Sequence, residues 1–213
     1  MSTIEAEKLK IDKRACNLTE LIHELADIFH LTLAEKNINL VLNIDPAMPA
    51  FLLLDKARLR QVLLNIIGNA IKLTEKGSIK IELQAASINK FQGKLDLHIS
   101  VTDSGLGISE EQQQLIFQKF EQSSDQDSRK YGSTGLGLSI SKRLVEMMGG
   151  SLSLTSQQGH GSKFTTTLLG VDIATLVPTT TENKNKDIAE KNFITFLPAS
   201  VLVVDDIEDN REF

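Results

Sequence analysis

Residues 130–141 read Lys-Tyr-Gly-Ser-Thr-Gly-Leu-Gly-Leu-Ser-Ile-Ser. The glycines Gly132, Gly135 and Gly137 allow backbone N–H groups to approach a ligand without obstruction by a Cβ atom. Apolar residues then recur at helical spacing, and the positive N-terminal end of a helix favours a phosphate. The spacing matches neither a P-loop nor a dinucleotide-binding fingerprint. By itself the stretch is therefore as consistent with a flexible connection as with a phosphate loop.

Composition is that of a soluble globular protein. The chain has 213 residues, of which 41% are hydrophobic and 24% charged, enough for one full domain and a further piece. A net charge of −5 gives no overall attraction to nucleic acid or to an anionic membrane. The single cysteine, Cys16, excludes an internal disulfide and a cysteine-cluster metal site. Without a membrane-spanning apolar run, we expect this piece in the cytoplasm, with no nucleic-acid partner and no direct membrane contact.

Hydrophobic periodicity predicts alternating helices and strands. Asn17 and Glu20 have the spacing of a capping box for a first helix, and Asp55 can cap a second, longer helix. Further helices are predicted over 110–120 and directly after the glycine stretch. Strands are predicted over 8–15, 38–44, 78–83, 95–103, 151–155 and 163–169.

The composition changes after residue 170. Residues 171–198 are rich in Thr, Asn, Lys and Glu, which is typical of a linker. The apolar run 201–204, followed by Asp205 and Asp206, is typical of the first strand of a doubly wound domain. We therefore divide the chain into a connection with the first strand (1–16), a main domain (17–170), a linker (171–198) and the start of a second domain (199–213).

A polar stripe follows one face of the predicted second helix, with apolar residues on both flanks. Amide side chains one turn apart, with a lysine one turn further on, can ligate a hard cation and reach a phosphate. A solvated helix face is the alternative, and the pattern leaves both open. Gly68, at the edge, is expected to leave room for something bulky. The stripe consists of Arg58, Gln61, Asn65, Asn69 and Lys72.

A carboxylate takes the place of a core residue at the end of the predicted strand 95–103. Side chains at every second position of a strand lie on the same face. Asp103 is therefore on the face of Leu95, Leu97, Ile99 and Val101, and it faces inward. A buried carboxylate without a partner would cost several kcal/mol, so Asp103 must meet a donor. The following Ser-Gly-Leu-Gly turn would give a pocket floor beside this acceptor. Stabilisation of the turn, or capping of the next helix, is the alternative role.

Taken together, these segments resemble the ATP-binding catalytic domain of sensor histidine kinases, within the gyrase, Hsp90, histidine kinase and MutL superfamily. Residues 65–72 (Asn-Ile-Ile-Gly-Asn-Ala-Ile-Lys) resemble its N box, 103–107 its G1 box, 116–120 its F box and 132–138 its G2 box. The resemblance extends from about residue 4 to residue 169, in the family's order. It implies an α/β fold of the Bergerat type, a two-layer sandwich in which a mixed sheet of about five strands packs on three helices.

The resemblance also implies roles for single residues. Asn69 would ligate Mg²⁺, beside Asn65, and Lys72 would contact phosphate, which makes these three the expected catalytic residues. Asp103 would accept a hydrogen bond from the adenine amino group. Residues 121–131 would form a lid over ATP or ADP, and Thr166 would reach the adenine side unless it is a core threonine. The other expected nucleotide-binding residues are Gly105, Gly107, Ile108, Phe120, Arg129, Lys130, Gly132, Ser133, Thr134, Gly135, Leu136, Gly137 and Leu138.

The implied function is ATP-dependent transfer of the γ-phosphoryl group to a histidine on a dimerisation hairpin, in a homodimeric parent associated with the membrane. That hairpin is not recognisable here, so we expect this piece to bind nucleotide without phosphorylating itself. Asp205 and Asp206 resemble the Mg²⁺-binding acidic pair of a receiver domain, which would make the parent a hybrid kinase of a phosphorelay that partners a receiver or response regulator. The alternative is a degenerate nucleotide-sensing or docking module, and an ATP-driven clamp is disfavoured by Asn65.

Overall fold

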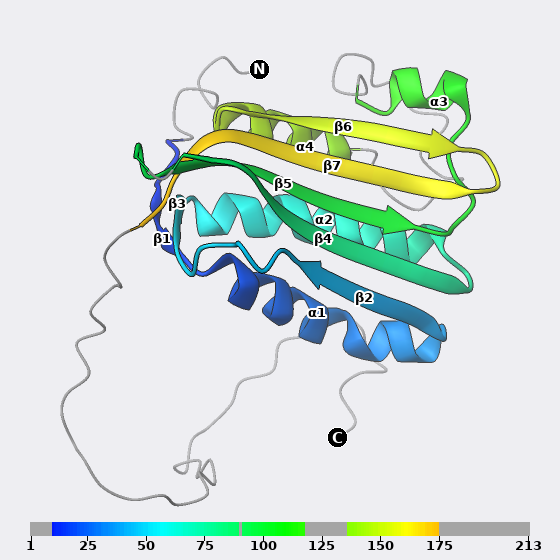
Figure 1. Cartoon of the computed structure of the whole chain (residues 1–213). Helices are drawn as coiled ribbons and strands as arrows, with labels where there is room; N and C mark the ends of the chain where they lie inside the picture. Colours follow the sequence, from blue (N-terminus) through cyan, green and yellow to red (C-terminus); the bar gives the residue numbers. More distant parts are fainter. Residues whose placement is uncertain (1–9, 90, 118–135, 175–213) are drawn as a thin grey trace, which may run out of the picture. The chain divides into compact units, whose positions relative to one another are not determined.

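A five-stranded sheet forms one layer of the computed structural model (Figure 1). The structure describes residues 10–89, 91–117 and 136–174, all within Met1–Pro178, the first of the chain's two units. The strand order is β2-β4-β5-β7-β6. The strands are β2 (Ile38–Ile44), β4 (Gly77–Asn89), β5 (Lys94–Asp103), β6 (Gly150–Gln157) and β7 (Gly161–Asp172). β2 is parallel to β4 and the other pairs are antiparallel, so the expected mixed sheet is confirmed.

Helices form the second layer, on one face of the sheet (Figure 1). They are α1 (Leu18–Glu35), α2 (Lys56–Leu73) and α4 (Leu136–Met147). The short helix α3 (Glu110–Leu115) lies apart from this layer, near the end of β6. The two-layer sandwich on three helices is confirmed.

The predicted helix starts are confirmed by their hydrogen bonds. Asn17 Oδ1 accepts from the backbone N–H of Glu20 at 3.1 Å. Asp55 Oδ1 accepts from the backbone N–H of Arg58 at 3.0 Å. Each cap satisfies a donor that the first turn of a helix leaves without an intrahelical partner, which is why α1 and α2 begin where they do.

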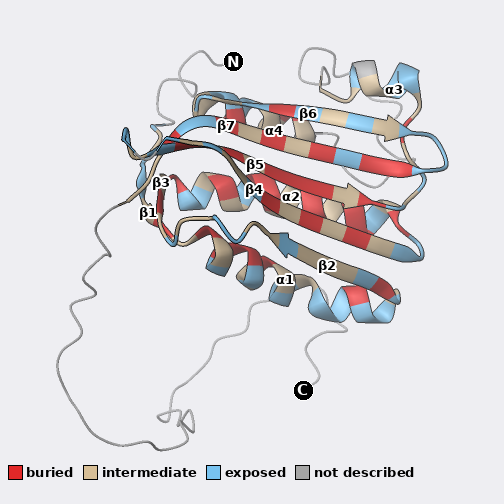
Figure 2. Cartoon of the chain, in the orientation of Figure 1, coloured by how far each residue is buried: buried red, intermediate tan, exposed pale blue. Residues whose placement is uncertain are grey.

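The core lies between the sheet and the helices, as the buried residues in Figure 2 show. The six α2 positions expected in the core are at most 3% exposed: Leu59, Val62, Leu63, Ile66, Ile67 and Ala70. The alternation expected for β5 is also confirmed, because Leu95, Leu97, Ile99 and Val101 are buried. Their burial on a shared face contributes about 1.5–3 kcal/mol per large side chain, which stabilises the two layers against each other.

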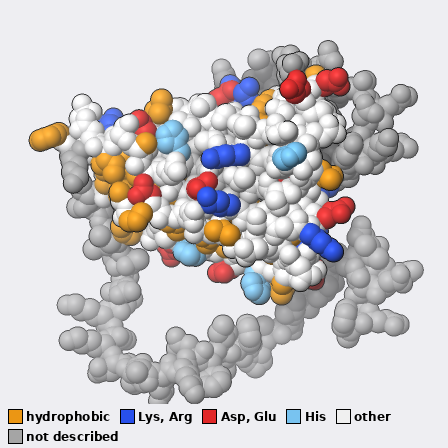
Figure 3. Space-filling model, turned by 45° about the vertical axis from the view of Figure 1, so that its right-hand side comes forward, with side chains coloured by type: hydrophobic (Ala, Val, Ile, Leu, Met, Phe, Trp, Pro, Cys, Tyr) orange, Lys and Arg blue, Asp and Glu red, His pale blue; other side chains and the backbone are white. Residues whose placement is uncertain are grey.

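The opposite face of the sheet is polar. Glu82 on β4 pairs with Lys80 at 2.7 Å and with Lys163 of β7 at 3.8 Å. These lysines lower the pKa of Glu82, with a smaller contribution from the Ser100 hydroxyl. In Figure 3, basic and acidic side chains are interspersed among uncharged ones over the visible face.

The segment that begins the domain and the segment that follows its last strand both contact the same short strand. β1 (Arg14–Cys16) pairs antiparallel with β3 (Leu52–Leu54), apart from the main sheet. After β7, Ile173 forms a bridge to Leu52, and the backbone N–H of Ala174 donates to Phe51 O at 3.0 Å. β3 therefore holds both the segment that precedes the domain and the segment that follows it.

Several element bounds differ from the prediction. β1 covers residues 14–16, whereas the predicted strand 8–15 began earlier; its residues 10–13 are not in a strand, and residues 8 and 9 lie outside the described part of the chain. β3 was not predicted. β4 runs on to Asn89. β7 runs on to Asp172, into the range assigned to the linker, because Val171 pairs with Leu95 and is only 8% exposed. The helix predicted over 110–120 ends at Leu115, and its last residues, like the proposed lid, lie outside the described part of the chain.

Candidate nucleotide site

Asn65 lies against α4. Its Nδ2 donates to Ser141 Oγ at 2.9 Å. A Cβ atom added to Gly137, in the first turn of α4, would overlap Asn65 Oδ1 and lie 2.8 Å from Asn65 Cγ. Gly137 therefore leaves the room in which the Asn65 amide lies against α4, a reason that the glycine pattern alone did not indicate.

The other expected residues of the polar stripe follow along α2. Asn69 is half-buried one turn after Asn65, and Lys72 is exposed in the last turn. The helix ends at Leu73, whose carbonyl oxygen accepts from the backbone N–H of Leu106 at 3.4 Å. The stripe therefore leads from the start of α4 to the loop that follows β5.

Gly68 leaves room for an aromatic ring of a neighbouring helix. A Cβ atom on Gly68 would meet only Phe29 Cζ of α1, at 4.0 Å. Gly68 thus faces the neighbouring helix, and the space beside it is filled by an aromatic ring of the protein itself.

Asp103 is a buried acceptor at the end of β5, as its parity predicted. It is 4% exposed, and its Oδ1 accepts from the backbone N–H of Gly105 at 2.9 Å. Burial raises the pKa of Asp103, and hydrogen bonds from the backbone of Gly105 and Ser162 oppose that rise. The turn-stabilising role is thus present. A carboxylate has about four acceptor positions, so capacity remains for a ligand amino group.

The loop after Asp103 is fixed by close packing on two sides. A Cβ atom on Gly105 would lie 2.5 Å from Leu73 O, at the end of α2. Gly107 has φ +65°, and a Cβ atom there would lie 2.7 Å from the carbonyl carbon of Gln157, at the end of β6. Leu106 O accepts from the backbone N–H of Gly159 at 2.7 Å. Both glycines are required because the loop runs between α2 and the β6–β7 turn.

Ser162, rather than Thr166, lies beside Asp103. The two residues are paired across β5 and β7, and Ser162 is 4% exposed. Thr166 pairs with Ile99 instead, four residues further along β7. It is 1% exposed, and its Oγ1 has no hydrogen-bond partner in the described part of the chain. The predicted inward parity of Thr166 was right, and its position among core residues fits the core alternative.

Ser162 belongs to a polar cluster that sequence reasoning missed. Ser156 Oγ lies 3.0 Å from Ser162 Oγ and accepts from the backbone N–H of Ile108 at 2.8 Å. Gln113 Nε2 donates to Ile108 O and to Ser156 O. The serines are far from Asp103 in sequence, and only the register of β5, β6 and β7 brings them beside it.

The remaining predicted residues divide into two groups. Ile108 is 5% exposed, and Leu138 packs against the core from the first turn of α4, which begins at Leu136. Those outside the described part of the chain are Phe120, Arg129, Lys130, Gly132, Ser133, Thr134, Gly135, Asp205 and Asp206.

The acidic and histidine side chains that the structure describes do not form a metal centre of their own. Within residues 10–89, 91–117 and 136–174, no group of three or more His, Cys, Asp and Glu could hold an ion. A cation there would rely on amide oxygens such as that of Asn69 and on oxygens of a ligand. A hollow of about 410 Å³ between β2 and β4 is lined by residues 42–45 and 82–84, none of them predicted site residues. None of the described helices is long and apolar enough to cross a membrane.

The family follows from comparison with known proteins. A family model described as "Histidine kinase-, DNA gyrase B-, and HSP90-like ATPase" matches residues 54–171, more than half of the chain. The chain belongs to this family. The matched range runs from the end of β3 to β7 and so contains α2, Asp103 and α4.

The similar curated proteins are kinases. The chain is 37% identical to the autoinducer 2 sensor kinase/phosphatase LuxQ of Vibrio cholerae and 36% identical to the signal transduction histidine-protein kinase BarA of Escherichia coli K12. Each match covers 76% of this chain, but only 19% of LuxQ and 18% of BarA. Hybrid signal transduction histidine kinase B of Dictyostelium discoideum is 38% identical over 78% of this chain and 8% of that protein. The chain thus spans less than a fifth of these relatives.

Solved structures agree with this assignment. Full-length ShkA in complex with AMPPNP is 28% identical, with a TM-score of 0.65, over 79% of this chain and 33% of that one. Histidine kinase ThkA, in complex with the response regulator TrrA, is 27% identical with a TM-score of 0.60, over 78% of this chain and 45% of that one. Residues 54–171 therefore form an ATP-binding catalytic domain of the histidine kinase type, a class of two-component signalling proteins.

Proposed function

We propose that this domain binds Mg²⁺–ATP and that its parent protein transfers the γ-phosphoryl group to a histidine. The observation that carries the proposal is Asp103, a carboxylate that is 4% exposed and whose acceptor capacity is only partly used. Burial of such a group is costly unless a donor meets it. An adenine amino group is a donor of the right kind, and the loop after Asp103 brings two glycines next to it.

The proposed roles follow from the chemistry of each group. Asp103 accepts from the adenine amino group and selects the base. Asn69 offers an amide oxygen to Mg²⁺, which supplies charge neutralisation at the phosphates when it is bound. Lys72, at the end of α2, offers an ammonium to phosphate. Positioning and electrostatic stabilisation dominate phosphoryl transfer, so the chain's contribution is to hold the nucleotide in one orientation.

The acceptor and the partners are proposed for the longer parent. We infer a histidine on a dimerisation hairpin as the acceptor, and a receiver domain or response regulator as the next partner. The hybrid kinase of Dictyostelium and the ThkA complex with a response regulator support this inference by similarity. Asp205 and Asp206 are the proposed start of an attached receiver domain, which would make the parent a hybrid kinase in a phosphorelay.

Calorimetry tests the nucleotide site directly. ATP should bind in the presence of Mg²⁺, and GTP should bind more weakly, by up to roughly 10⁴-fold, because a buried acceptor rejects a carbonyl oxygen. Asp103→Asn should remove most of this selectivity. The matched control is Asp27→Asn, which makes the same change at an exposed residue of α1 and should leave both affinities unchanged. Equal affinity of the unmodified protein for ATP and GTP would contradict the role of Asp103.

Phosphotransfer requires the parent protein. The parent, with its upstream hairpin and γ-labelled ATP, should form an acid-labile, base-stable phosphohistidine. Nucleotide binding without label in that protein would instead indicate a nucleotide-sensing or docking module.

A further inference from the structure

We propose that Gln113 is a positioning residue that couples the docking of α3 to occupation of the base end of the site. The inference rests on the proposed nucleotide binding. Gln113 Nε2 donates to Ile108 O at 2.8 Å and to Ser156 O at 3.0 Å. One side-chain amide thereby joins three parts of the fold: α3, the segment after the glycine loop, and β6. Both hydrogens of Gln113 Nε2 are used, so this group has no further hydrogen bond to donate.

A continuous path of hydrogen bonds leads from this contact to Asp103. The backbone N–H of Ile108 donates to Ser156 Oγ, which in turn donates to Gly161 O at 2.8 Å. Because the single proton of Ser156 Oγ is directed at Gly161, the hydroxyl of Ser162 donates across the 3.0 Å that separate the two serines. Ser162 is the residue paired with Asp103 across β5 and β7, so its backbone lies beside the carboxylate, whose pKa it lowers. Displacement of Gln113 therefore disturbs the acceptor that selects the base.

α3 depends on this contact because it is short. A helix of six residues is not stable in isolation, and the side chain of Leu115, at its end, is 53% exposed. Just beyond α3, the ring of Phe117 lies 5.3 Å from Lys142 Nζ of α4, which adds a second and weaker attachment. Gln113 is thus the main polar attachment of α3 to the sheet among the contacts of residues 110–117.

Coupling between two sites is reciprocal. If Gln113 links the base end to α3, a nucleotide that orders residues 103–108 must also favour docked α3, and docked α3 must favour nucleotide to the same extent.

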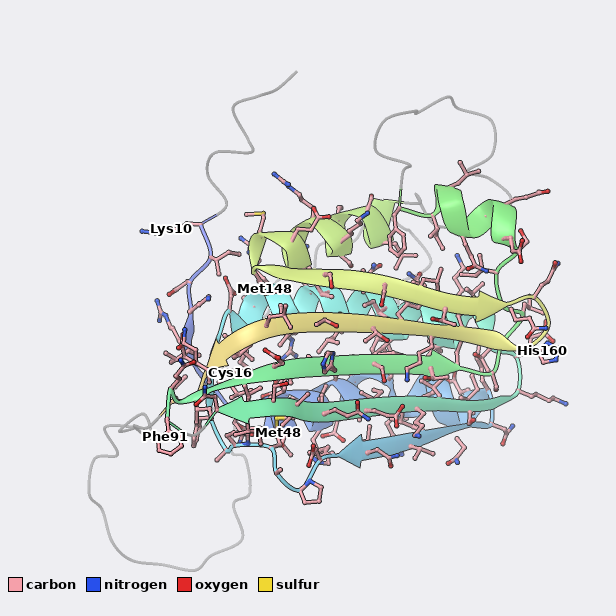
Figure 4. All side chains as sticks on the ribbon, turned by 45° about the horizontal axis from the view of Figure 1, so that its top comes forward. Lys10, Cys16, Met48, Phe91, Met148 and His160 are labelled. Carbon is pink, nitrogen blue, oxygen red and sulfur yellow. The ribbon has the colours of Figure 1, made fainter. Side chains whose placement is uncertain are left out.

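The β6–β7 turn, where His160 lies, is at the opposite end of the sheet from Phe91 and from Cys16 (Figure 4). The coupling is therefore confined to one end of the domain.

The test compares Gln113→Glu with Gln112→Glu in the full 213-residue chain. Both substitutions add one negative charge to the same exposed helix, but only the first places a carboxylate against two carbonyl oxygens. ADP affinity, measured by calorimetry, should fall about 5- to 20-fold for Gln113→Glu and stay within about 2-fold for Gln112→Glu. Gln113→Ala, which removes the donor without adding charge, should also lower the affinity for ADP. It replaces Gln113→Glu in the test if that variant does not fold.

Hydrogen exchange separates coupling from a merely structural role. ADP should slow exchange of the backbone amides of residues 112–116 in the unmodified chain and in Gln112→Glu, and should not do so in Gln113→Glu or Gln113→Ala. The inference is overturned if the unmodified chain binds ADP but the Gln113 variants bind it equally well, or if α3 exchange does not respond to ADP. Failure of the unmodified chain to bind any adenine nucleotide would overturn the proposed function as well.

Discussion

Gly137 and Asn65 are in direct contact, so that a Cβ atom on residue 137 would overlap the side-chain amide of Asn65. The contact joins the helix that carries the polar stripe to the helix that follows the glycine stretch. Asn65 also donates to Ser141, one turn further along α4. Glycine at 137 thus accommodates the Asn65 amide within the protein, whatever its backbone does for a phosphate.

Gly137→Ala is therefore expected to destabilise the fold as well as to weaken nucleotide binding. The added methyl group must displace the Asn65 amide, at the expense of its hydrogen bond to Ser141, or move α4 away from α2. Either change costs about 1–3 kcal/mol. Urea unfolding followed by circular dichroism measures the loss. Gly68→Ala is the matched control, because a Cβ atom there meets only Phe29 at 4.0 Å, and alanine in a helix is more stable than glycine by about 0.5–1 kcal/mol.

The double variant Gly137→Ala with Asn65→Ala identifies the cause. Removal of the Asn65 amide should relieve the overlap, so the two changes together should cost less than the sum of the single changes by about 0.5–3 kcal/mol. If the cost of the double variant equals the sum of the two single costs, the strain in Gly137→Ala does not come from contact with Asn65.

Asp103 should make adenine binding depend on pH. Burial raises its pKa above the ordinary value, so the folded protein without ligand holds this proton more tightly than the unfolded chain does. This group therefore lowers stability as the pH rises from the unfolded-state pKa to the folded-state pKa. The ionised carboxylate is the stronger acceptor for the adenine amino group, so affinity should fall as the pH drops through the raised pKa.

Calorimetric titration with adenosine from neutral pH down to the acid limit of the folded state measures this effect without interference from phosphate protonation. The affinity of Asp103→Asn, which lacks the titrating group, should be nearly independent of pH over that range. A pH profile unchanged by the substitution would assign the dependence to another group.

Lys36 should stabilise the end of the helix that carries the stripe. Its Nζ donates to Ile71 O at 2.7 Å and to Thr74 O at 3.4 Å, beside the negative end of the α2 dipole. Lys36→Met, which keeps much of the side-chain length, should lower the free energy of unfolding by about 1–2 kcal/mol. The exposed Lys76 offers a control, since Lys76→Met should change stability by less than about 0.5 kcal/mol. Equal effects of the two substitutions would exclude the capping role.

Asn69→Ala should reduce the contribution of Mg²⁺ to ATP affinity. The amide oxygen of Asn69 is the protein ligand proposed for the cation, so the ratio of ATP affinities with and without Mg²⁺ should approach one in this variant. Binding of adenosine, which carries no phosphate, should be unaffected. Asn43→Ala, on the exposed side of β2, is the control. An unchanged Mg²⁺ ratio in Asn69→Ala would show that the cation depends on other ligands.

The parts of the fold with strong local patterns could be predicted from the sequence. β2 has the predicted bounds, and the caps at Asn17 and Asp55 were identified because capping depends on residues within one turn. The pairing of β1 with β3 was not predicted, because strands of three residues carry no measurable periodicity. The extension of β7 past Gly170 was missed because its partner, Leu95, is distant in sequence.

In the site, too, features that depend on one segment could be predicted, and contacts between segments distant in sequence could not. Asp103 was identified because one strand reveals which face a residue occupies. The alternation along one strand does not reveal which residue of the next strand lies opposite, so the sequence did not indicate that Ser162 is paired with Asp103 and Thr166 with Ile99. The Gln113 contact also depends on register, with Ser156 as its partner, and no local signal indicated it.

The strand β3 has a mechanical consequence. It is hydrogen-bonded to β1, which begins the domain, and it meets Ile173 and Ala174, which leave it. A pull on the segment before Arg14 is thus passed across Leu52 to the segment after β7. Asp103 is not on this route, because it pairs with Ser162, two residues after His160, and His160 lies at the opposite end of the sheet from Cys16 (Figure 4). Tension between these two segments would therefore load the pairing of β1 with β3 and the bridge from Leu52 to Ile173 before it reached the end of the sheet that holds Asp103.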